Sequence, residues 1–175
     1  MRASTEIVWA LFKTFVFTIC VPAIVGVWVP YRIGCSGDLR KILEASFQLR
    51  FVVGVVFFLV GAAIYLWCAW DFAVKGLGTP APIDEPKKLI VSGLYRFVRN
   101  PMYVGVACLI SAQAIVCASR PVFYYLMFFL LCVHLFVLLY EEPHLRRIFA
   151  GQYEDYRRHV PRWLPRFTAY RSSAT

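Results

Sequence analysis

A group of basic, amide and aromatic side chains stands directly before the third long apolar stretch of the chain. Arg96, Arg99 and Asn100 precede Pro101. Asparagine is favoured just before a helix because its side-chain oxygen accepts a hydrogen bond from an early helical N–H, and proline suits the first helical position. The pattern predicts a helix that begins at Pro101, with its positive dipole end beside two arginines. Such a helix end binds anions.

Two adjacent acids, Glu141 and Glu142, close the fourth apolar stretch. His134 precedes Glu141 by seven residues, a spacing that places both on one helical face. An ionisable residue within a span usually faces the protein interior or a wet cavity. For His134 alone, a satisfied interior histidine is the more frequent outcome, and the two acids alone can mark the water boundary. A structural role and a functional role therefore both stay open for His134 and the two acids.

The ligand that would use all these groups has several chemical parts. A carboxylate or phosphate suits Arg99 and the helix that begins after Asn100. A carboxylate from Glu141 or Glu142 suits a ribose diol or a cation, and tyrosine faces suit a flat base or a positive centre. S-adenosylmethionine combines an adenine, a ribose, an amino-acid end and a sulfonium. A nucleotide or a lipid headgroup meets several of the same demands.

The composition shows which elements must position these residues. The 175 residues are 60% hydrophobic and 17% charged, which is too apolar for a typical soluble domain. Long charge-free stretches of the length that crosses a bilayer recur along the chain. For the first of them a signal peptide is the disfavoured alternative. We predict an all-α membrane protein forming one domain over residues 1–175, with spans at about 7–30, 50–74, 101–119 and 121–142 and an interfacial C-terminal helix at about 143–159.

The basic residues predict the orientation of the chain. They gather in the segment 75–100 and after Pro143, whereas the link between the third and fourth spans holds only Arg120. Positive residues favour the cytoplasmic side, so we expect an integral multi-pass membrane protein whose termini and active site face the cytoplasm, in the cell inner membrane if the source is bacterial. The net charge is +9, and the basic residues responsible for it flank the spans. No nucleic-acid motif accompanies them. We therefore predict membrane lipids, and no nucleic acid, as partners.

Two further patterns complete the prediction. In the tail helix, apolar residues recur at spacings of three and four, at Leu145, Ile148, Phe149, Tyr153 and Tyr156. Five of the six cysteines lie within the apolar stretches, where they behave as small buried residues, so we predict no disulfide framework. The Cys and His spacings do not match a zinc site, and we predict no metal.

The ordered motifs resemble the isoprenylcysteine carboxyl methyltransferase and phospholipid methyltransferase superfamily over roughly residues 80–165. They are Gly93-x-Tyr95-x-x-x-Arg99-Asn100-Pro101-x-Tyr103-x-Gly105, Glu141-Glu142-Pro-x-Leu, Tyr153-x-x-Tyr156 and Val160-Pro-Arg162-x-x-Pro165. The resemblance implies an integral membrane enzyme that transfers a methyl group from S-adenosylmethionine to a lipophilic small-molecule or prenylated acceptor. It places the cofactor pocket at the cytosolic ends of the last spans, closed by the C-terminal segment.

The resemblance also implies site residues. We expect Arg99, Asn100 and Glu142 at the catalytic centre. The expected cofactor-binding residues are Tyr95, Arg99, Asn100, Pro101, Tyr103, Gly105, His134, Glu141, Glu142, Tyr153, Tyr156 and Arg162.

One position departs from the isoprenylcysteine branch, which commonly carries histidine where this chain has Asn100. Asparagine cannot shuttle a proton near neutral pH. An ionised carboxylate acceptor needs no base, whereas an amine or thiol must first be deprotonated. The sequence therefore leaves the acceptor open between an isoprenylcysteine-like carboxylate and a phospholipid amine, with a small thiol or amine, or an inactive accessory protein of the same fold, as alternatives.

Overall fold

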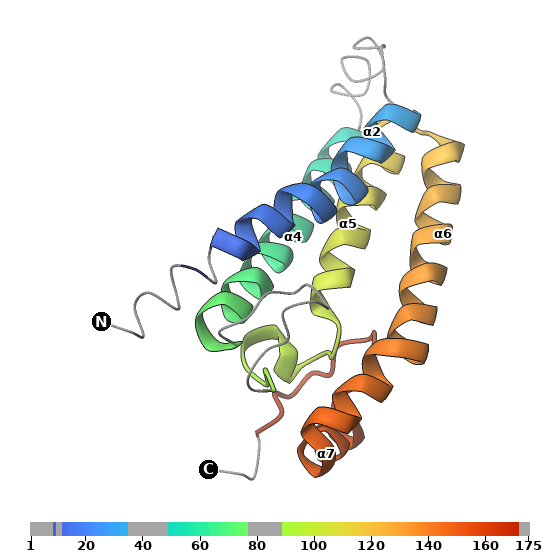
Figure 1. The fold of residues 1–175 in the computed structure, drawn as a ribbon. Coiled ribbons are helices and arrows are strands. Elements are labelled where there is room, and N and C mark those ends of the chain that lie inside the picture. Colours follow the sequence, from blue (N-terminus) through green and yellow to red (C-terminus); the bar gives the residue numbers. More distant parts are fainter. Residues whose placement is uncertain (1–8, 10–11, 35–48, 77–88, 172–175) are drawn as a thin grey trace.

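The structure, a computed structural model, describes Trp9 and residues 12–34, 49–76 and 89–171. These residues form helices and connecting segments, and the described ranges contain no strand. Four helical passes run antiparallel between the two ends of one bundle (Figure 1). The prediction of an all-α fold is confirmed.

The first pass is a helix over Phe12–Gly34 that departs from α-helical geometry in its middle. It is π-helical over Ile19–Trp28 (η1) and ends as α2 (Val29–Gly34), past the predicted end at residue 30. Pro30 has no N–H to offer the carbonyls one turn earlier. Two side chains supply those bonds instead: Tyr125 Oη donates to the Val25 carbonyl at 2.9 Å and Gln113 Nε2 to that of Gly26 at 2.8 Å. Backbone carbonyls at membrane depth need such partners.

The second and third passes form the tightest helix pair. Helix α4 (Leu49–Asp71) continues as a π-helical turn, η2 (Phe72–Gly76), and packs against α5 (Pro101–Val116). A Cβ added to Gly61 would lie 2.7 Å from the carbonyl oxygen of Gly105. The two backbones therefore approach as closely as glycines allow, a common way to pack helices in a membrane.

Helix α5 is shorter than predicted. It ends at Val116 instead of residue 119, because Ala118 adopts a left-handed backbone with φ 44°. Its length is therefore about 24 Å, against a hydrocarbon core of about 30 Å. The other three passes contain helices long and apolar enough to cross a membrane, and Pro101–Val116 is a shorter apolar helix.

The fourth pass reverses direction at a short turn after α5. Ser119 caps α6 (Arg120–Phe136) by accepting a hydrogen bond from the Val122 N–H at 3.5 Å. A π-helical turn, η4 (Val137–Glu141), then joins α6 to α7 (Glu142–His159). The third and fourth passes therefore form a helical hairpin.

Helix α7 follows the predicted apolar periodicity with one exception. Tyr153 and Tyr156 are buried, and Leu145 and Phe149 pack against them. Ile148, predicted on the same face, is 43% exposed. The backbone departs from helical geometry at Ala150, with φ 40° and ψ −119°, so one continuous helical stripe does not extend across α7.

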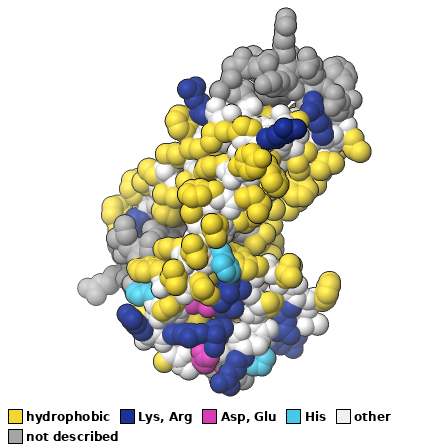
Figure 2. Space-filling view, turned by 90° about the vertical axis from the view of Figure 1, so that its right-hand side faces the viewer, with side chains coloured by type: hydrophobic (Ala, Val, Ile, Leu, Met, Phe, Trp, Pro, Cys, Tyr) yellow, Lys and Arg dark blue, Asp and Glu magenta, His cyan; other side chains and the backbone are white. Residues whose placement is uncertain are grey.

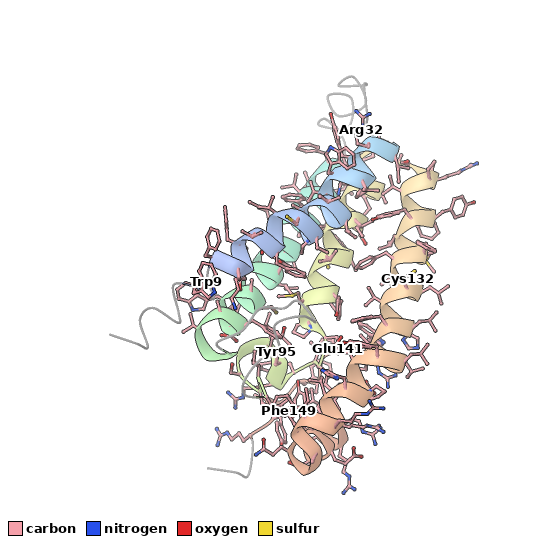
Figure 3. The ribbon with its side chains drawn as sticks, in the orientation of Figure 1. Trp9, Arg32, Tyr95, Cys132, Glu141 and Phe149 are labelled. Atoms are coloured by element: carbon pink, nitrogen blue, oxygen red, sulfur yellow. The ribbon has the colours of Figure 1, made fainter. Side chains whose placement is uncertain are left out.

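The outer surface agrees with a multi-pass membrane protein. Figure 2 shows an apolar band over the middle of the molecule, with Lys and Arg side chains toward both ends. Leu59 of the second pass and Phe128 and Leu139 of the fourth are 62%, 64% and 71% exposed. Figure 3 places Arg32 at one end of the bundle and Phe149 at the other. A lipid environment would cover this otherwise unfavourable surface.

One cysteine differs from the prediction. Cys117, in the turn after α5, is disulfide-bonded, while Cys20, Cys68, Cys108 and Cys132 are free. The expectation that Cys117 behaves as an unpaired apolar residue is therefore wrong. It follows α5 instead of lying within a span, since the helix ends one residue earlier.

Candidate active site

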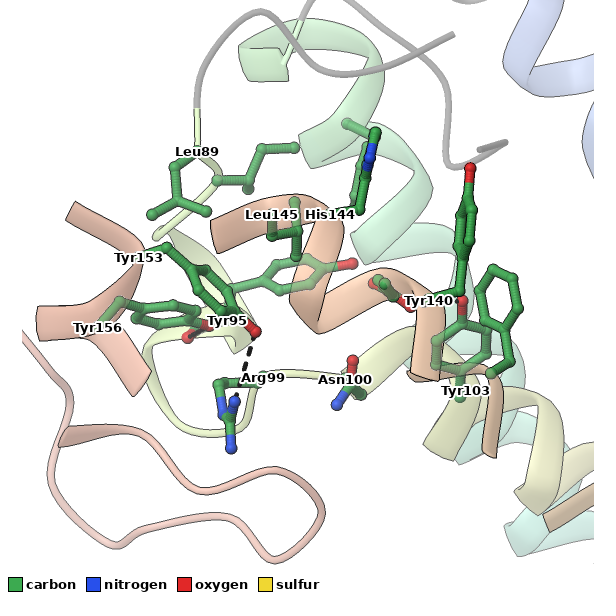
Figure 4. Close-up of a pocket in the computed structure, with 14 residues that line it drawn as sticks. Leu89, Tyr95, Arg99, Asn100, Tyr103, Tyr140, His144, Leu145, Tyr153 and Tyr156 are labelled. Carbon is green, nitrogen blue, oxygen red and sulfur yellow. Dashed lines mark hydrogen bonds between the residues drawn. The ribbon is translucent and has the colours of Figure 1, made fainter. Parts of the chain in front are cut away.

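A cavity opens where the ends of the last three passes meet α7 (Figure 4). The space between its protein atoms, part of it open to solvent, amounts to about 830 Å³. The lining residues come from the end of the second pass, the segment before α5, the first turn of α5, and the stretch from the end of α6 through α7. They are Phe72, Leu89, Ile90, Tyr95, Arg99, Asn100, Tyr103, Phe136, Tyr140, Glu141, His144, Leu145, Tyr153 and Tyr156.

A buried ion-pair cluster supports one side of the cavity. Glu142 is only 4% exposed and accepts hydrogen bonds from Arg99 Nη1 at 2.8 Å and from Arg162 Nε and Nη2 at 2.6 and 3.0 Å. Two cations therefore neutralise one buried carboxylate, an arrangement that compensates for its desolvation. The hydrogen bond from Arg162 comes from a residue 20 positions along the chain, so Glu142 ties the C-terminal segment to α7.

Arg99 has a buried donor that this cluster does not use. Its side chain is 10% exposed, Nη1 also lies 3.4 Å from the Tyr153 hydroxyl, and Nε is buried with no hydrogen-bond partner. A buried, unsatisfied N–H is costly and marks a group that a ligand or ion can satisfy. Arg99 lines the cavity, so the unsatisfied donor belongs to a residue that a bound ligand would contact.

The C-terminal segment runs back across the loop before α5 as a strap, residues 160–170. Backbone hydrogen bonds join Arg99 N to the Pro161 carbonyl at 2.9 Å and Arg166 N to the Phe97 carbonyl at 3.0 Å. Arg96 Nε donates to the Tyr170 carbonyl at 2.8 Å. The strap therefore holds the segment that carries the basic and aromatic lining residues.

Asn100 takes a different bond from the one predicted. Its side chain makes no capping hydrogen bond to α5; Nδ2 instead donates to the Arg162 carbonyl at 3.2 Å. The helix nevertheless begins at Pro101, as predicted. The backbone at Asn100, with φ −122° and ψ 51°, turns the chain. The Asn100 side chain therefore bonds to the strap and not to the first turn of α5.

Tyrosines form the wall opposite the membrane-spanning helices. Tyr156 donates its hydroxyl to the Tyr95 carbonyl at 2.6 Å, and the Tyr153 and Tyr156 rings meet edge to face at 6.2 Å. Burial raises the pKa of the Tyr95, Tyr153 and Tyr156 hydroxyls, so each stays protonated at neutral pH. This wall presents aromatic surface and neutral hydroxyls to a ligand.

The membrane-facing wall combines a carboxylate with an aromatic ladder. Tyr103 on α5 donates its hydroxyl to Glu141 Oε2 at 3.0 Å. Phe136, Tyr140 and His144 follow at helical spacing, with stacked rings at 5.3 and 5.5 Å. Phe136 and Tyr140 line the cavity although 37% and 47% of their surface is exposed, so the cavity reaches the outer surface beside α6.

The structure brings together seven of the residues expected at the site and places five beside it. Lining the cavity are Tyr95, Arg99, Asn100, Tyr103, Glu141, Tyr153 and Tyr156. The cavity lining does not include Pro101, Gly105, His134, Glu142 or Arg162.

These five residues have other contacts or positions. Pro101 is the buried first residue of α5, and Gly105 lies at the crossing with α4. His134 Nδ1 accepts a hydrogen bond from Trp163 Nε1 of the strap at 3.1 Å. The π-helical turn η4 separates His134 from Glu141 and changes the helical register, so the expected shared face is not formed. Glu142 and Arg162 form the supporting ion pair.

Sequence reasoning missed half of the lining. Phe136, Tyr140 and His144 carry a usable signal, since their spacing of four continues one helical face into the Glu141-Glu142-Pro motif. Phe72 and Leu89 carry none, because only folding brings the end of the second pass beside α7. In the described part of the chain, no group of three or more His, Cys, Asp or Glu is placed to hold a metal ion.

Comparison with known families gives one match. The model of the phospholipid methyltransferase family matches residues 49–152, more than half of the chain. The chain belongs to the phospholipid methyltransferase family. No curated protein and no solved structure matches it.

Membership places the chain among membrane methyltransferases. The matched range begins with α4 and ends within α7, so it contains most of the cavity lining. Tyr153, Tyr156 and the strap follow it. In this protein, Tyr153 and Tyr156 of the tyrosine wall therefore lie beyond the family match, whereas Tyr95 lies within it.

Proposed function

We propose that the protein transfers a methyl group from S-adenosylmethionine to a lipophilic or amphipathic acceptor at the membrane. The observation that carries the proposal is the buried Arg99 with an unsatisfied Nε, on an aromatic cavity of a phospholipid methyltransferase family member. An anion, a flat base and a cation would each find a matching group here.

The residues present fit the cofactor part by part. Arg99 and the N-terminus of α5 suit its carboxylate. The faces of Tyr95, Tyr153 and Tyr156 suit the adenine and the sulfonium. The cofactor would supply an electrophilic methyl group on sulfur; the protein would supply position and a water-poor site.

In this proposal, Glu142 and Arg162 hold other groups in position and do not contact the ligand. Glu142 holds Arg99 in place through a 2.8 Å ion pair and anchors the strap through Arg162. Catalysis by orientation depends on such support, because small displacements of a binding group cost much of the rate. Asn100 contributes similarly, since its amide holds the strap at the Arg162 carbonyl.

The acceptor would enter from the bilayer. Phe136 and Tyr140 belong both to the cavity lining and to the exposed surface of the fourth pass. A lipophilic chain can lie along this surface while its polar end enters the cavity. An amphipathic acceptor therefore suits the site better than a freely soluble one.

We place the cavity end in the cytoplasm. Seven arginines follow Pro143, which favours the cytoplasmic side for α7 and the strap. The disulfide at Cys117 lies at the far end of α5, and disulfides persist in oxidising compartments. Reporter fusions after Thr175 and in the α5–α6 turn should therefore lie on opposite sides of the membrane.

Ligand binding tests the proposal directly. Calorimetry on detergent-purified protein should show binding of S-adenosylmethionine and S-adenosylhomocysteine without added metal. Folded protein that binds neither would overturn the methyl-transfer proposal and favour an inactive accessory protein of the same fold. Binding without transfer to lipids, prenylcysteine analogues, small amines or small thiols would also favour that alternative.

A further inference from the structure

The adjacent acids Glu141 and Glu142 occupy different electrostatic environments. Glu142 lies outside the cavity lining and is paired with two arginines. Glu141 lines the cavity, and among the described residues no cation forms an ion pair with it. The η4 turn ends between them, so consecutive carboxylates point to different surroundings.

The Glu141 carboxylate is held in one orientation but can still accept hydrogen bonds. Tyr103 donates to Oε2 at 3.0 Å, and within the described ranges it is the one hydrogen-bond donor to this carboxylate. A carboxylate accepts about four hydrogen bonds, so Oε1 retains its acceptor capacity. The site therefore holds a fixed carboxylate at the cavity wall with one oxygen open to a ligand.

We infer that Glu141 is the proton acceptor of the methyl-transfer reaction, an assignment that rests on the proposed function. A protonated amine or a thiol would give its proton to Glu141 Oε1. The freed lone pair would then form the bond to the methyl carbon, while the carbon–sulfur bond breaks and its electron pair stays on sulfur. A carboxylic acid on Glu141, the methylated acceptor and S-adenosylhomocysteine result, and the proton is later lost to water.

This assignment selects between the acceptors that the sequence left open. A carboxylate acceptor is already ionised and needs no base. Beside Glu141 it would also meet a like charge at short range. A protonated amine would instead be attracted to the same carboxylate and to the aromatic faces of Tyr103 and Tyr140. The geometry therefore favours an amine or thiol over an isoprenylcysteine-like carboxylate.

Other titratable groups share the cavity or adjoin Glu141, and they bear on any pH dependence. They are Tyr95, Arg99, Tyr103, Tyr140, Glu142, His144, Tyr153 and Tyr156.

The test compares Glu141→Gln with Glu154→Gln, a glutamate on the outer part of α7 whose side chain is 35% exposed. Methyl transfer from labelled S-adenosylmethionine is measured with phosphatidylethanolamine, an alkanethiol and farnesylcysteine. Binding of S-adenosylhomocysteine is measured separately by calorimetry. The wild type should methylate the amine or the thiol. Glu141→Gln should lower kcat by roughly 10²- to 10⁴-fold and leave the Kd of S-adenosylhomocysteine within threefold. Glu154→Gln should change neither quantity.

A second variant keeps the inference testable if Glu141→Gln fails to fold. Tyr103→Phe removes the donor to Oε2, which favours the protonated carboxyl. The acid limb of the kcat profile should therefore move to higher pH.

The outcomes separate the inference from the function on which it rests. Wild-type protein that binds no cofactor would overturn the proposed function itself. With the cofactor bound, three results would overturn the role of Glu141 alone. The first is preferred methylation of farnesylcysteine, or methylation of none of the probes, and the second is an undiminished kcat in Glu141→Gln. The third is a lost affinity of that variant for S-adenosylhomocysteine, which would make Glu141 a cofactor contact. An unshifted acid limb in Tyr103→Phe would count equally against it.

Discussion

Helices α4 and α5 border a cavity at each of their ends, and the two cavities differ in chemistry more than in size. The active-site cavity, with about 830 Å³ of space that is partly open to solvent, is lined by Arg99, Glu141 and several tyrosines. The far-end cavity, with about 510 Å³ that is also partly open, has an apolar exposed lining. It is formed by Tyr31, Gly54, Val55, Phe58, Ala112, Gln113, Val116 and Cys117.

The difference lies in how the polar groups are used. Gln113, at the far end, donates its amide to the carbonyls of Gly26 and Leu109 at 2.8 and 3.1 Å. At the active-site end, Arg99 keeps an unsatisfied Nε and Glu141 an open oxygen. Volume between helices is therefore not enough to define a site. Polar groups that the fold orients without satisfying distinguish a binding cavity from a packing defect.

The largest effect is expected at Glu142, which holds both Arg99 and the strap. Glu142→Ala leaves two buried or half-buried arginines without their shared partner, and breaking such a pair costs about 3–5 kcal/mol. We expect a lower unfolding temperature in detergent and weak binding of S-adenosylhomocysteine. Glu154→Ala is the control, because its ion pairs are surface-exposed. A Glu142→Ala protein as stable as the control would show that the cluster does not support the cavity.

Arg99→Ala should separate ligand binding from folding more cleanly. Loss of one desolvated charged contact typically costs about 2–5 kcal/mol, which is tens- to thousands-fold in affinity. The Kd of S-adenosylhomocysteine should rise accordingly in a titration. Arg158→Ala, on the exposed side of α7, should change binding little. Equal, small effects of both variants would assign Arg99 to membrane anchoring instead of the cofactor.

A substitution at the seam between the two cavities should act on stability. A Cβ at Gly105 would lie 2.9 Å from the Gly61 carbonyl oxygen and 3.0 Å from the Tyr65 nitrogen. Both neighbours are backbone, so α4 and α5 must separate in Gly105→Ala, at a cost of about 1–3 kcal/mol. We expect a lower unfolding temperature in detergent, with residual cofactor affinity in the folded fraction. Alanine has the higher helix propensity, so a propensity effect alone would raise the unfolding temperature of Gly105→Ala. An unchanged unfolding temperature in Gly105→Ala would mean that the helices do not cross here.

The smallest effect is expected in the far-end cavity. Ala112→Val adds two methyl groups beside a space of about 510 Å³. Because open space lies beside the added groups, the free energy of unfolding should change by less than the about 1–3 kcal/mol that extra methyl groups cost in a well-packed core. The Kd of S-adenosylhomocysteine should stay within twofold of wild type. A larger change in affinity would show that the two ends are coupled through α5 and would break the comparison.

The two ends also differ in how well the sequence predicts them. At the active-site end, the motif Arg99-Asn100-Pro101 predicts the start of α5, and the structure confirms it. At the far end, periodicity extends α5 to residue 119, but the left-handed backbone of Ala118 ends it at Val116. Hydropathy detects a span but not its last turn, because the residues of the turn are themselves apolar or small.

Local pattern was also insufficient for the partners of individual side chains. Asn100 has the residue type of a helix cap, yet its amide bonds to the strap. His134 and Glu141 have the spacing of one helical face, yet a π-helical turn lies between them. His134 bonds to Trp163, whereas Glu141 lines the cavity. In both cases a segment distant in sequence supplied the deciding contact.

The sequence by itself determined the membrane class, the antiparallel order of the passes and the motifs that contribute to one end of the bundle. Runs of apolar residues and helix-start signals are local features of the sequence. In a bilayer such runs form helices, because a helix satisfies its own backbone hydrogen bonds. Tertiary structure alone decided which motif residues line the cavity and which support it. Glu141 and Glu142 are chemically identical neighbours, and only the register of η4 and the reach of Arg162 assign one to the cavity and the other to the ion pair. That choice depends on contacts between residues far apart in the chain, which composition and spacing do not encode.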